Sequence, residues 1–129
     1  MKKIKIDLAI EKGDGNLWGS INYNQNMIAD YGNDITDLES KLKKLLYEWE
    51  NIDPNLVEFE HTYHVYALFE QFDFLNISKI AERADINPGL LRQYASGVKN
   101  PSQKQAKKIE ETIHRLADEM KKMTIYTVA

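Results

Sequence analysis

The spacing of apolar residues changes several times along the 129-residue chain and divides it into strand-like and helix-like segments. Residues 3–10 and 16–23 alternate polar and apolar side chains, as strands with one buried face do. The segment EKGDGN lies between them and supplies the Gly and Asp residues of a tight hairpin turn. Residues 26–31 and 56–63 also alternate, and they predict a third and a fourth strand beside the first two.

One helix is expected inside this strand-rich half. Its apolar stripe has helical spacing and consists of Ile35, Leu38, Leu42, Leu45, Leu46 and Trp49. Two N-caps are compatible with the sequence: Asp34, or Thr36 with Glu39 at capping-box spacing. Pro54 is expected to end the helix. The first half therefore predicts a small antiparallel sheet with one helix.

The second half has helical spacing throughout. Residues 65–72, VYALFEQF, predict a short helix or an extension of the strand before it. Two short helices follow, with Asn76 and Asn87 as N-caps, and Gly97 suits the left-handed residue that ends the second one. A long helix is expected after Pro101, with the apolar stripe Ala106, Ile109, Ile113, Leu116, Met120 and Met123.

These segments predict an α+β chain, with one domain at residues 1–72 and an all-helical domain at residues 73–129. The first part contains seven lysines and thirteen carboxylates, a net charge of −6, whereas the second has a net charge of +3. Residues 87–108 contain five basic side chains and no acidic one. Because the surface of a soluble helix usually mixes both signs, this segment predicts a surface that contacts a polyanion.

The two short helices have the spacing of a helix-turn-helix. Helices that cross at a large angle need a small side chain where they meet, and Ala81 supplies it. The turn needs a left-handed residue, a conformation that Asp85 tolerates better than most residue types. The side chains expected to face inward are Ile80, Ala84, Ile86, Leu91 and Tyr94.

The helix at residues 88–96 is the expected recognition helix. The residues that face outward from it are Asn87, Gly89, Arg92, Gln93 and Ser96. Such a helix meets base edges in the major groove, where Arg92 can bind guanine and Gln93 can pair with adenine. Lys99 and Lys104 are expected on phosphates of double-stranded DNA. The alternative to DNA binding is a helix pair whose polar side chains only face solvent. The absence of carboxylates from residues 87–108 favours DNA binding.

No catalytic residue, metal site or cofactor is expected. The chain has no cysteine, which excludes a disulfide framework, a thiolate nucleophile and a zinc finger. Asp34 and Asp37 suit a helix start, and His61 and His64 lie on opposite faces of a predicted strand. The longest apolar run, VYALF, is too short to cross a bilayer. The protein is therefore expected to be cytoplasmic and not an enzyme.

The segment LLRQYASGVKNPS contains an aromatic residue, then a small residue and Gly, a basic loop and Pro-Ser. With this segment, residues 74–116 resemble the C-terminal helix-turn-helix half of HicB-type antitoxins, in particular the form with a repressor-like helix cluster. GDGNLWGSI and YGNDITDLESKLKKLLYEWE resemble, more weakly, the first hairpin of the HicB fold and the start of its single helix. Residues 22–27, NYNQNM, depart from the family, which has a Pro- and Gly-containing segment there.

The resemblance implies a partial RNase H-like domain without catalytic activity, followed by a DNA-binding domain. It implies an antitoxin that sequesters a small mRNA-cleaving toxin, HicA, through the first domain and represses its own operon through the second. A two-fold operator suits a homodimer or a higher oligomer, and the apolar tail MKKMTIYTVA is a candidate extension of that interface. The alternatives are a stand-alone regulator without a toxin, an inhibitor that mainly masks a toxin, and an orphan interaction module.

Trp18 is expected in the core or partly buried, with a partner contact as the alternative.

Overall fold

A computed structural model describes residues 2–128 and divides the chain into two compact units. The first unit ends at Gln71 and the second begins at Phe72, one residue before the boundary expected from the sequence. Each unit has its own buried apolar residues. The first contains a sheet and two helices and the second contains helices, so the predicted α+β class is confirmed.

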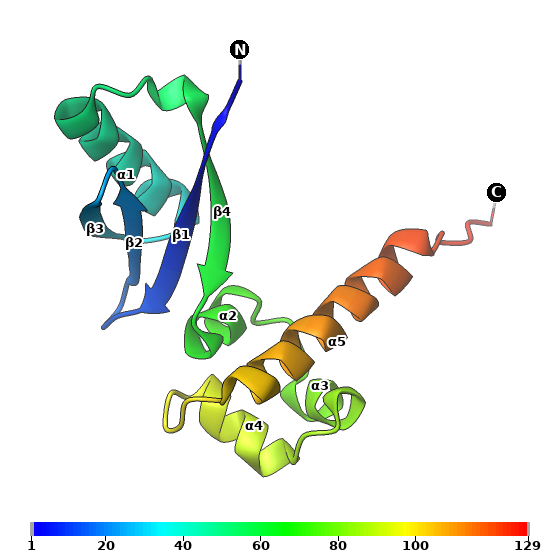
Figure 1. Ribbon diagram of the computed structural model, residues 1–129. Helices are drawn as coiled ribbons and strands as arrows, with labels where there is room; N and C mark the ends of the chain where they lie inside the picture. The colour runs from blue at the N-terminus through cyan, green and yellow to red at the C-terminus, as the bar shows by residue number, and fades with distance from the viewer. Residues whose placement is uncertain (1, 129) are drawn as a thin grey trace. The chain divides into compact units, whose positions relative to one another are not determined.

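The sheet of the first unit is mixed (Figure 1). Its strands are β1 (Ile4–Lys12), β2 (Leu17–Tyr23), β3 (Asn26–Gly32) and β4 (Val57–Tyr63), in the order β3-β2-β1-β4. β2 runs antiparallel to β1 and β3, whereas β4 pairs with β1 in parallel. The prediction of an antiparallel sheet is therefore wrong at β4. A helix between β3 and β4 returns the chain to the end where β3 began, so β4 runs in the same direction as β3.

Both hairpin turns contain residues with positive φ. Gly15, in the predicted turn between β1 and β2, has a φ of 74°. Asn24 and Gln25 join β2 to β3 with φ values of 52° and 67°. A two-residue type I′ turn requires positive φ at both central residues, and Asn tolerates it well. The segment that departs from the HicB pattern therefore still forms a tight hairpin.

Helix α1 (Ile35–Glu50) follows β3. Asp34 is its N-cap rather than Thr36, because the Asp34 side chain accepts a hydrogen bond from a backbone N–H of the first turn at 2.8 Å. The helix ends at Asn51, which is left-handed, and not at Pro54 as predicted. An Asn in this conformation caps the final carbonyls with its own N–H, so no proline is needed there.

The core of the first unit lies between the sheet and α1. Its largest fully buried side chains are Leu8, Ile10, Ile21, Ile28, Leu38, Leu42 and Leu46. At the end of β3, a Cβ on Gly32 would overlap the backbone of α1, so only Gly permits this close approach. Trp49 is 63% exposed, contrary to the prediction. The apolar stripe thus continues one turn beyond the buried part of α1.

Two short helical segments flank β4. The 3-10 turn η1 (Pro54–Leu56) precedes it and α2 (Val65–Gln71) follows it. The helical alternative for residues 65–72 is therefore correct. α2 buries Val65, Ala67 and Phe69, and Ala67 belongs to the core of the first unit.

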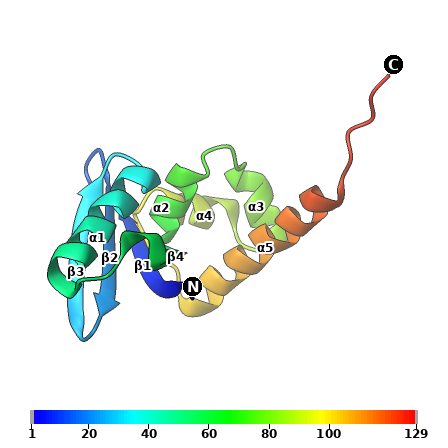
Figure 2. The ribbon, with the colours of Figure 1, turned by 90° about the horizontal axis from the view of Figure 1, so that it is seen from above.

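The second unit consists of α3 (Ile77–Ala84), α4 (Pro88–Ala95) and α5 (Gln103–Lys122). Figure 2 shows α5 as a long helix that runs on past α3. Asn76 and Ser102 cap α3 and α5, and their side chains accept hydrogen bonds from backbone N–H groups at 3.1 Å and 3.2 Å. Within residues 2–128, no helix is long and apolar enough to cross a membrane.

Candidate nucleic-acid interface

α3 and α4 pack through a small apolar core. All of the side chains predicted to face inward are buried, as is Ala81: Ile80, Ala81, Ala84, Ile86, Leu91 and Tyr94. Ala81 is fully buried, which permits close approach of the helices. Burial of Leu91 and Tyr94 decides which side of α4 faces solvent. The predicted rotation of α4 about its axis is thereby confirmed.

Asp85 forms the turn between α3 and α4. It is left-handed, with φ 57° and ψ 48°, as the sequence predicts. Its N–H donates to the carbonyls of Ala81 and Glu82, and the N–H of Ile86 donates to Ala81 at 2.9 Å. These bonds satisfy the last carbonyls of α3, so the turn can be tight.

Asn87 caps α4 as predicted. Its Oδ1 accepts hydrogen bonds from the N–H groups of Gly89 at 2.9 Å and Leu90 at 3.2 Å, and Pro88 occupies the first helical position. Both lone pairs of Oδ1 are therefore used by the helix. Asn87 can offer a base only its side-chain NH₂ group.

The other predicted base-contacting residues lie on the outward face of α4, which consists of Gly89, Arg92, Gln93 and Ser96 and is exposed. The guanidinium of Arg92 donates to the Oγ of Ser78, in the first turn of α3, at 2.6 Å. This bond restrains a long side chain that would otherwise sample many rotamers. A guanidinium has five N–H donors, so Arg92 keeps donors for a guanine edge.

An open groove of about 580 Å³ runs beside Arg92. Two carboxylates, Glu82 and Asp85, line it together with Ser78 and Asn87. The acid-free stretch of sequence therefore meets acidic side chains of α3 in space. Carboxylates repel phosphates but accept hydrogen bonds from the N4 amino group of cytosine. This groove suits base edges better than the DNA backbone.

The loop after α4 folds back onto the end of that helix. The backbone carbonyl of Gln93 accepts hydrogen bonds from the N–H groups of Val98 at 3.0 Å and Lys99 at 3.2 Å, and from the Ser96 hydroxyl at 3.2 Å. Gly97 has a φ of 83°, which confirms the predicted left-handed residue. The backbone of Lys99 is thereby held at a set distance from the outward face of α4.

Lys104 lies in the first turn of α5 and, like Lys99, has an exposed side chain. The first backbone N–H groups of a helix carry partial positive charge, which adds to that of a nearby lysine. Lys99 thus adds positive charge at one end of α4, and Lys104 adds it at the start of α5.

The outer sheet face of the first unit is a second exposed surface. It combines apolar side chains, Trp18, Met27 and Tyr31, with carboxylates, Asp7, Glu11, Glu58 and Glu60, all of them exposed. Trp18 lies opposite Tyr31 across the strands, with 5.2 Å between ring centroids. A Cβ on Gly13 would overlap the indole, so this glycine makes room for the ring. Trp18 is 44% exposed, in accord with the expectation of partial burial.

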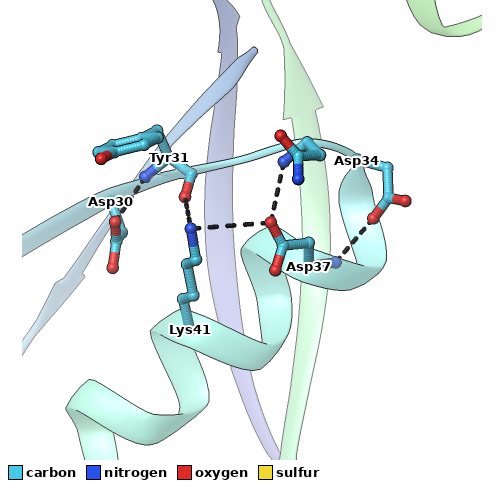
Figure 3. A network of polar contacts seen from close by, with 6 residues as sticks. Asp30, Tyr31, Asp34, Asp37 and Lys41 are labelled. Carbon is cyan, nitrogen blue, oxygen red and sulfur yellow. Dashed lines mark hydrogen bonds and ion pairs between the residues drawn. The ribbon is translucent and has the colours of Figure 1, made fainter.

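The acids at the start of α1 have structural roles (Figure 3). Asp34 caps the helix, and Asp37 accepts the N–H of Asn33 at 2.9 Å and lies 3.7 Å from Lys41 Nζ. Lys41 in turn donates to the carbonyl of Tyr31 at 3.0 Å. The hydrogen bonds between these groups hold α1 against the end of β3.

His61 of the first unit has one carboxylate beside it. His61 Nε2 lies 3.0 Å from Glu39 Oε2. Burial, and next to it the charge of Glu39, raises the pKa of the nearby Tyr63 phenol. Among residues 2–128, no group of three or more His, Cys, Asp or Glu side chains is placed to hold a metal ion.

Searches with protein-family models, among curated proteins and among solved structures each returned no match for this chain. The resemblance to HicB-type antitoxins therefore stays a prediction from the sequence.

Two features of the candidate interface were missed from the sequence: the Ser78–Arg92 hydrogen bond and the acidic side of the groove. Ser78 and Glu82 lie on α3, whereas Arg92 lies on α4. Only the packing of α3 on α4 brings these side chains together. Their signal in the sequence is indirect: both lie on α3 within the helix-turn-helix pattern.

Proposed function

We propose that the protein is a HicB-like antitoxin and transcriptional repressor that binds double-stranded operator DNA through α3 and α4. The main support is the outward face of α4: it is exposed, free of carboxylates, and contains an arginine oriented by Ser78. A protein with this function works in the cytoplasm. The α+β fold alone supports no function, because one fold serves many.

In the proposed complex, α4 enters the major groove. Arg92 binds the O6 and N7 atoms of a guanine, and Gln93 pairs with a neighbouring adenine. Lys99 and Lys104 contact phosphates on the flank, which positions α4 without reading sequence. Gly89 and Ser96 lie close to the DNA, and Asn87 donates through its amide NH₂.

The test starts with selection of preferred sites from a random duplex library by the full-length protein. Arg92→Ala is expected to lose about 1–3 kcal/mol of discrimination at one guanine position. Lys99→Ala is expected to weaken binding to all sequences alike and to reduce the slope of log K against log salt by about one. Lys44 is an exposed lysine on α1 of the first unit. Lys44→Ala removes the same charge and should change neither the base discrimination nor the salt slope.

A salt slope that does not change in Lys99→Ala would contradict the phosphate contact. If the library yields no preferred site and Arg92→Ala binds like the wild type, DNA reading by α4 is wrong. An orphan interaction module would then be the better account of the second unit.

The outer sheet face favours a second activity, inhibition of a HicA-like toxin. Trp and Tyr are enriched at protein interfaces. Exposed carboxylates outnumber lysines on this face, and Glu11 lies beside Trp18, so the face suits a basic partner. The test is co-purification with the product of a neighbouring gene for a small basic protein. Trp18→Ala should weaken the complex and leave DNA binding unchanged. The proposal gives the first unit no catalytic role, so the protein should leave RNA intact in the presence of Mg²⁺.

A further inference from the structure

The two edge strands of the sheet, β3 and β4, differ in how their backbone groups are used. At the β3 edge, the Tyr31 N–H donates to Asp30 Oδ1 at 2.8 Å, and the Tyr31 carbonyl accepts from Lys41 Nζ at 3.0 Å. Charged side chains at a sheet edge hinder pairing with a further strand. The β3 edge is therefore blocked beside Tyr31.

The β4 edge lacks these obstacles. β4 pairs with β1 through seven consecutive residues, without a bulge or a proline. Figure 1 shows β4 beside β1 at the edge of the sheet, and within residues 2–128 no strand pairs with its other side. A long, regular edge of this kind is a template for another strand.

The hydrogen bonds to β1 show which backbone groups of β4 point to the open edge. The N–H of His64, directly after β4, donates to the carbonyl of Ile10 on β1 at 2.9 Å. Backbone groups alternate in direction along a strand, so those of Thr62 also face β1. Those of Phe59 and His61 then point away from β1, toward the open edge.

The side chains of β4 indicate which strand would fit. Glu58 and Glu60 are exposed on the outer sheet face, and Asp7 of β1 lies opposite Glu60. Lys5 lies 3.9 Å from Glu60 and offsets one of these charges. On the other face, Phe59 packs against the core and stays partly exposed. An added strand would therefore need basic side chains on one face and apolar ones on the other.

We propose that the open edge of β4 binds an extended segment of another protein in which basic and apolar side chains alternate. The backbone of this segment extends the sheet through hydrogen bonds to Phe59 and His61, and its basic side chains lie beside Glu58 and Glu60. A second copy of this chain is a poorer occupant, because β4 paired with β4 would bring carboxylates of both strands together. The inference goes beyond the proposed function and needs neither α4 nor Trp18.

The first test follows backbone amide exchange in the full-length protein by NMR. In the free protein, the Phe59 and His61 amides should exchange at least about 10-fold faster than the Thr62 amide, which bonds to β1, after correction for intrinsic rates. A short peptide of alternating lysine and valine should slow exchange at Phe59 and His61. A peptide that only neutralises the carboxylates would leave these two amides unprotected.

The second test measures the affinity of the labelled peptide by fluorescence anisotropy. His61→Pro removes the outward N–H but none of the bonds to β1, and should raise the dissociation constant at least about 10-fold relative to His61→Ala. His61→Ala is the matched control, because it loses the same side chain and keeps the N–H. A peptide with glutamate in place of lysine should bind at least about 10-fold more weakly than the lysine peptide.

A charge-reversal variant keeps the proposal testable if His61→Pro does not fold. Glu58→Lys should weaken binding of the lysine peptide and strengthen binding of the glutamate peptide. Glu48→Lys, at an exposed position of α1, makes the same charge change away from β4 and should alter neither affinity. Circular dichroism checks that the variants keep the wild-type fold.

A lysine peptide that does not bind, or that binds without protecting the His61 amide, overturns the proposal. Equal affinities of His61→Pro and His61→Ala overturn it too. A free protein whose His61 amide is as protected as that of Thr62 already has a covered edge, and oligomers in sedimentation would then identify a second copy as the occupant. Arg92→Ala and Trp18→Ala should keep peptide binding, so failure of the proposed function leaves this inference standing.

Discussion

The outward face of α4 and the outer sheet face present opposite chemistry to solvent. α4 offers Arg92, Gln93 and the lysines beyond its end, with no carboxylate of its own. The outer sheet face offers Trp18 and Tyr31, with Glu11 beside Trp18 and Lys41 over the Tyr31 ring. Each surface stands on a separate compact unit with its own buried residues. The chain therefore carries two exposed surfaces of different composition, one on each unit.

The two surfaces also differ in how their key side chains are held. Arg92 is restrained by one hydrogen bond that its guanidinium donates to Ser78 on a neighbouring helix. Trp18 is restrained by ring contact with Tyr31 and by the space that Gly13 leaves. A pre-oriented arginine favours hydrogen bonding to a planar edge, and pre-oriented aromatic rings favour contact area. This contrast is what the following substitutions test.

The largest expected effect separates the stability of the two units. Leu91→Ala removes a side chain that is fully buried between α3 and α4 and should destabilise the second unit by about 2–5 kcal/mol. Leu42→Ala should do the same to the first unit. Thermal unfolding followed by circular dichroism should show two transitions, each lowered by only one of the variants. A single transition lowered equally by both would mean that the units fold as one.

A smaller effect is expected at the outer sheet face. Trp18→Ala removes the aromatic pair with Tyr31 and should destabilise the first unit by about 1–2 kcal/mol. Trp49→Ala is the control, because Trp49 is more exposed and should cost less. Urea denaturation followed by circular dichroism measures both. Equal losses would show that the Trp18–Tyr31 contact adds nothing to folding.

At the proposed DNA-binding face, Ser78→Ala should reduce discrimination at the proposed guanine position by about 0.5–1.5 kcal/mol, since Arg92 loses one charge-assisted hydrogen bond. The salt slope should not change, because no charge is removed. Ser78→Thr keeps the hydroxyl and should restore the discrimination. A loss of stability without a change in base preference would show that Ser78 supports the fold and does not orient Arg92 for base recognition.

The smallest expected effect lies at the turn of the helix-turn-helix. Asp85→Gly relieves a left-handed non-glycine residue and removes one carboxylate from the groove. Stability should change by less than about 1 kcal/mol, because the relief is offset by the greater freedom of glycine in the unfolded chain. Asp85→Asn removes the charge and keeps a residue type that tolerates the left-handed conformation, so chemical denaturation of the two variants separates the effects.

Local chemistry was sufficient to predict the ends and the rotation of the short helices. Asn76 and Asn87 cap these helices by accepting N–H groups only two or three residues away, and Asp85 and Gly97 form turns with adjacent residues. Such contacts join residues that are close in the chain, so they can be predicted from the spacing of residues in the sequence. The buried face of α4 follows in the same way from the spacing of Leu91 and Tyr94.

Only the tertiary structure decided the features that join distant segments. β4 runs parallel to β1, Ser78 orients Arg92, and Glu82 borders the groove beside it. The sequence also did not predict that the end of the apolar stripe of α5 is exposed. An apolar pattern predicts that a helix face is buried, but it does not specify how far along the helix other elements cover that face. Residue spacing specifies contacts within a few turns of chain, whereas the direction of a strand or the partner of a side chain depends on how whole elements pack.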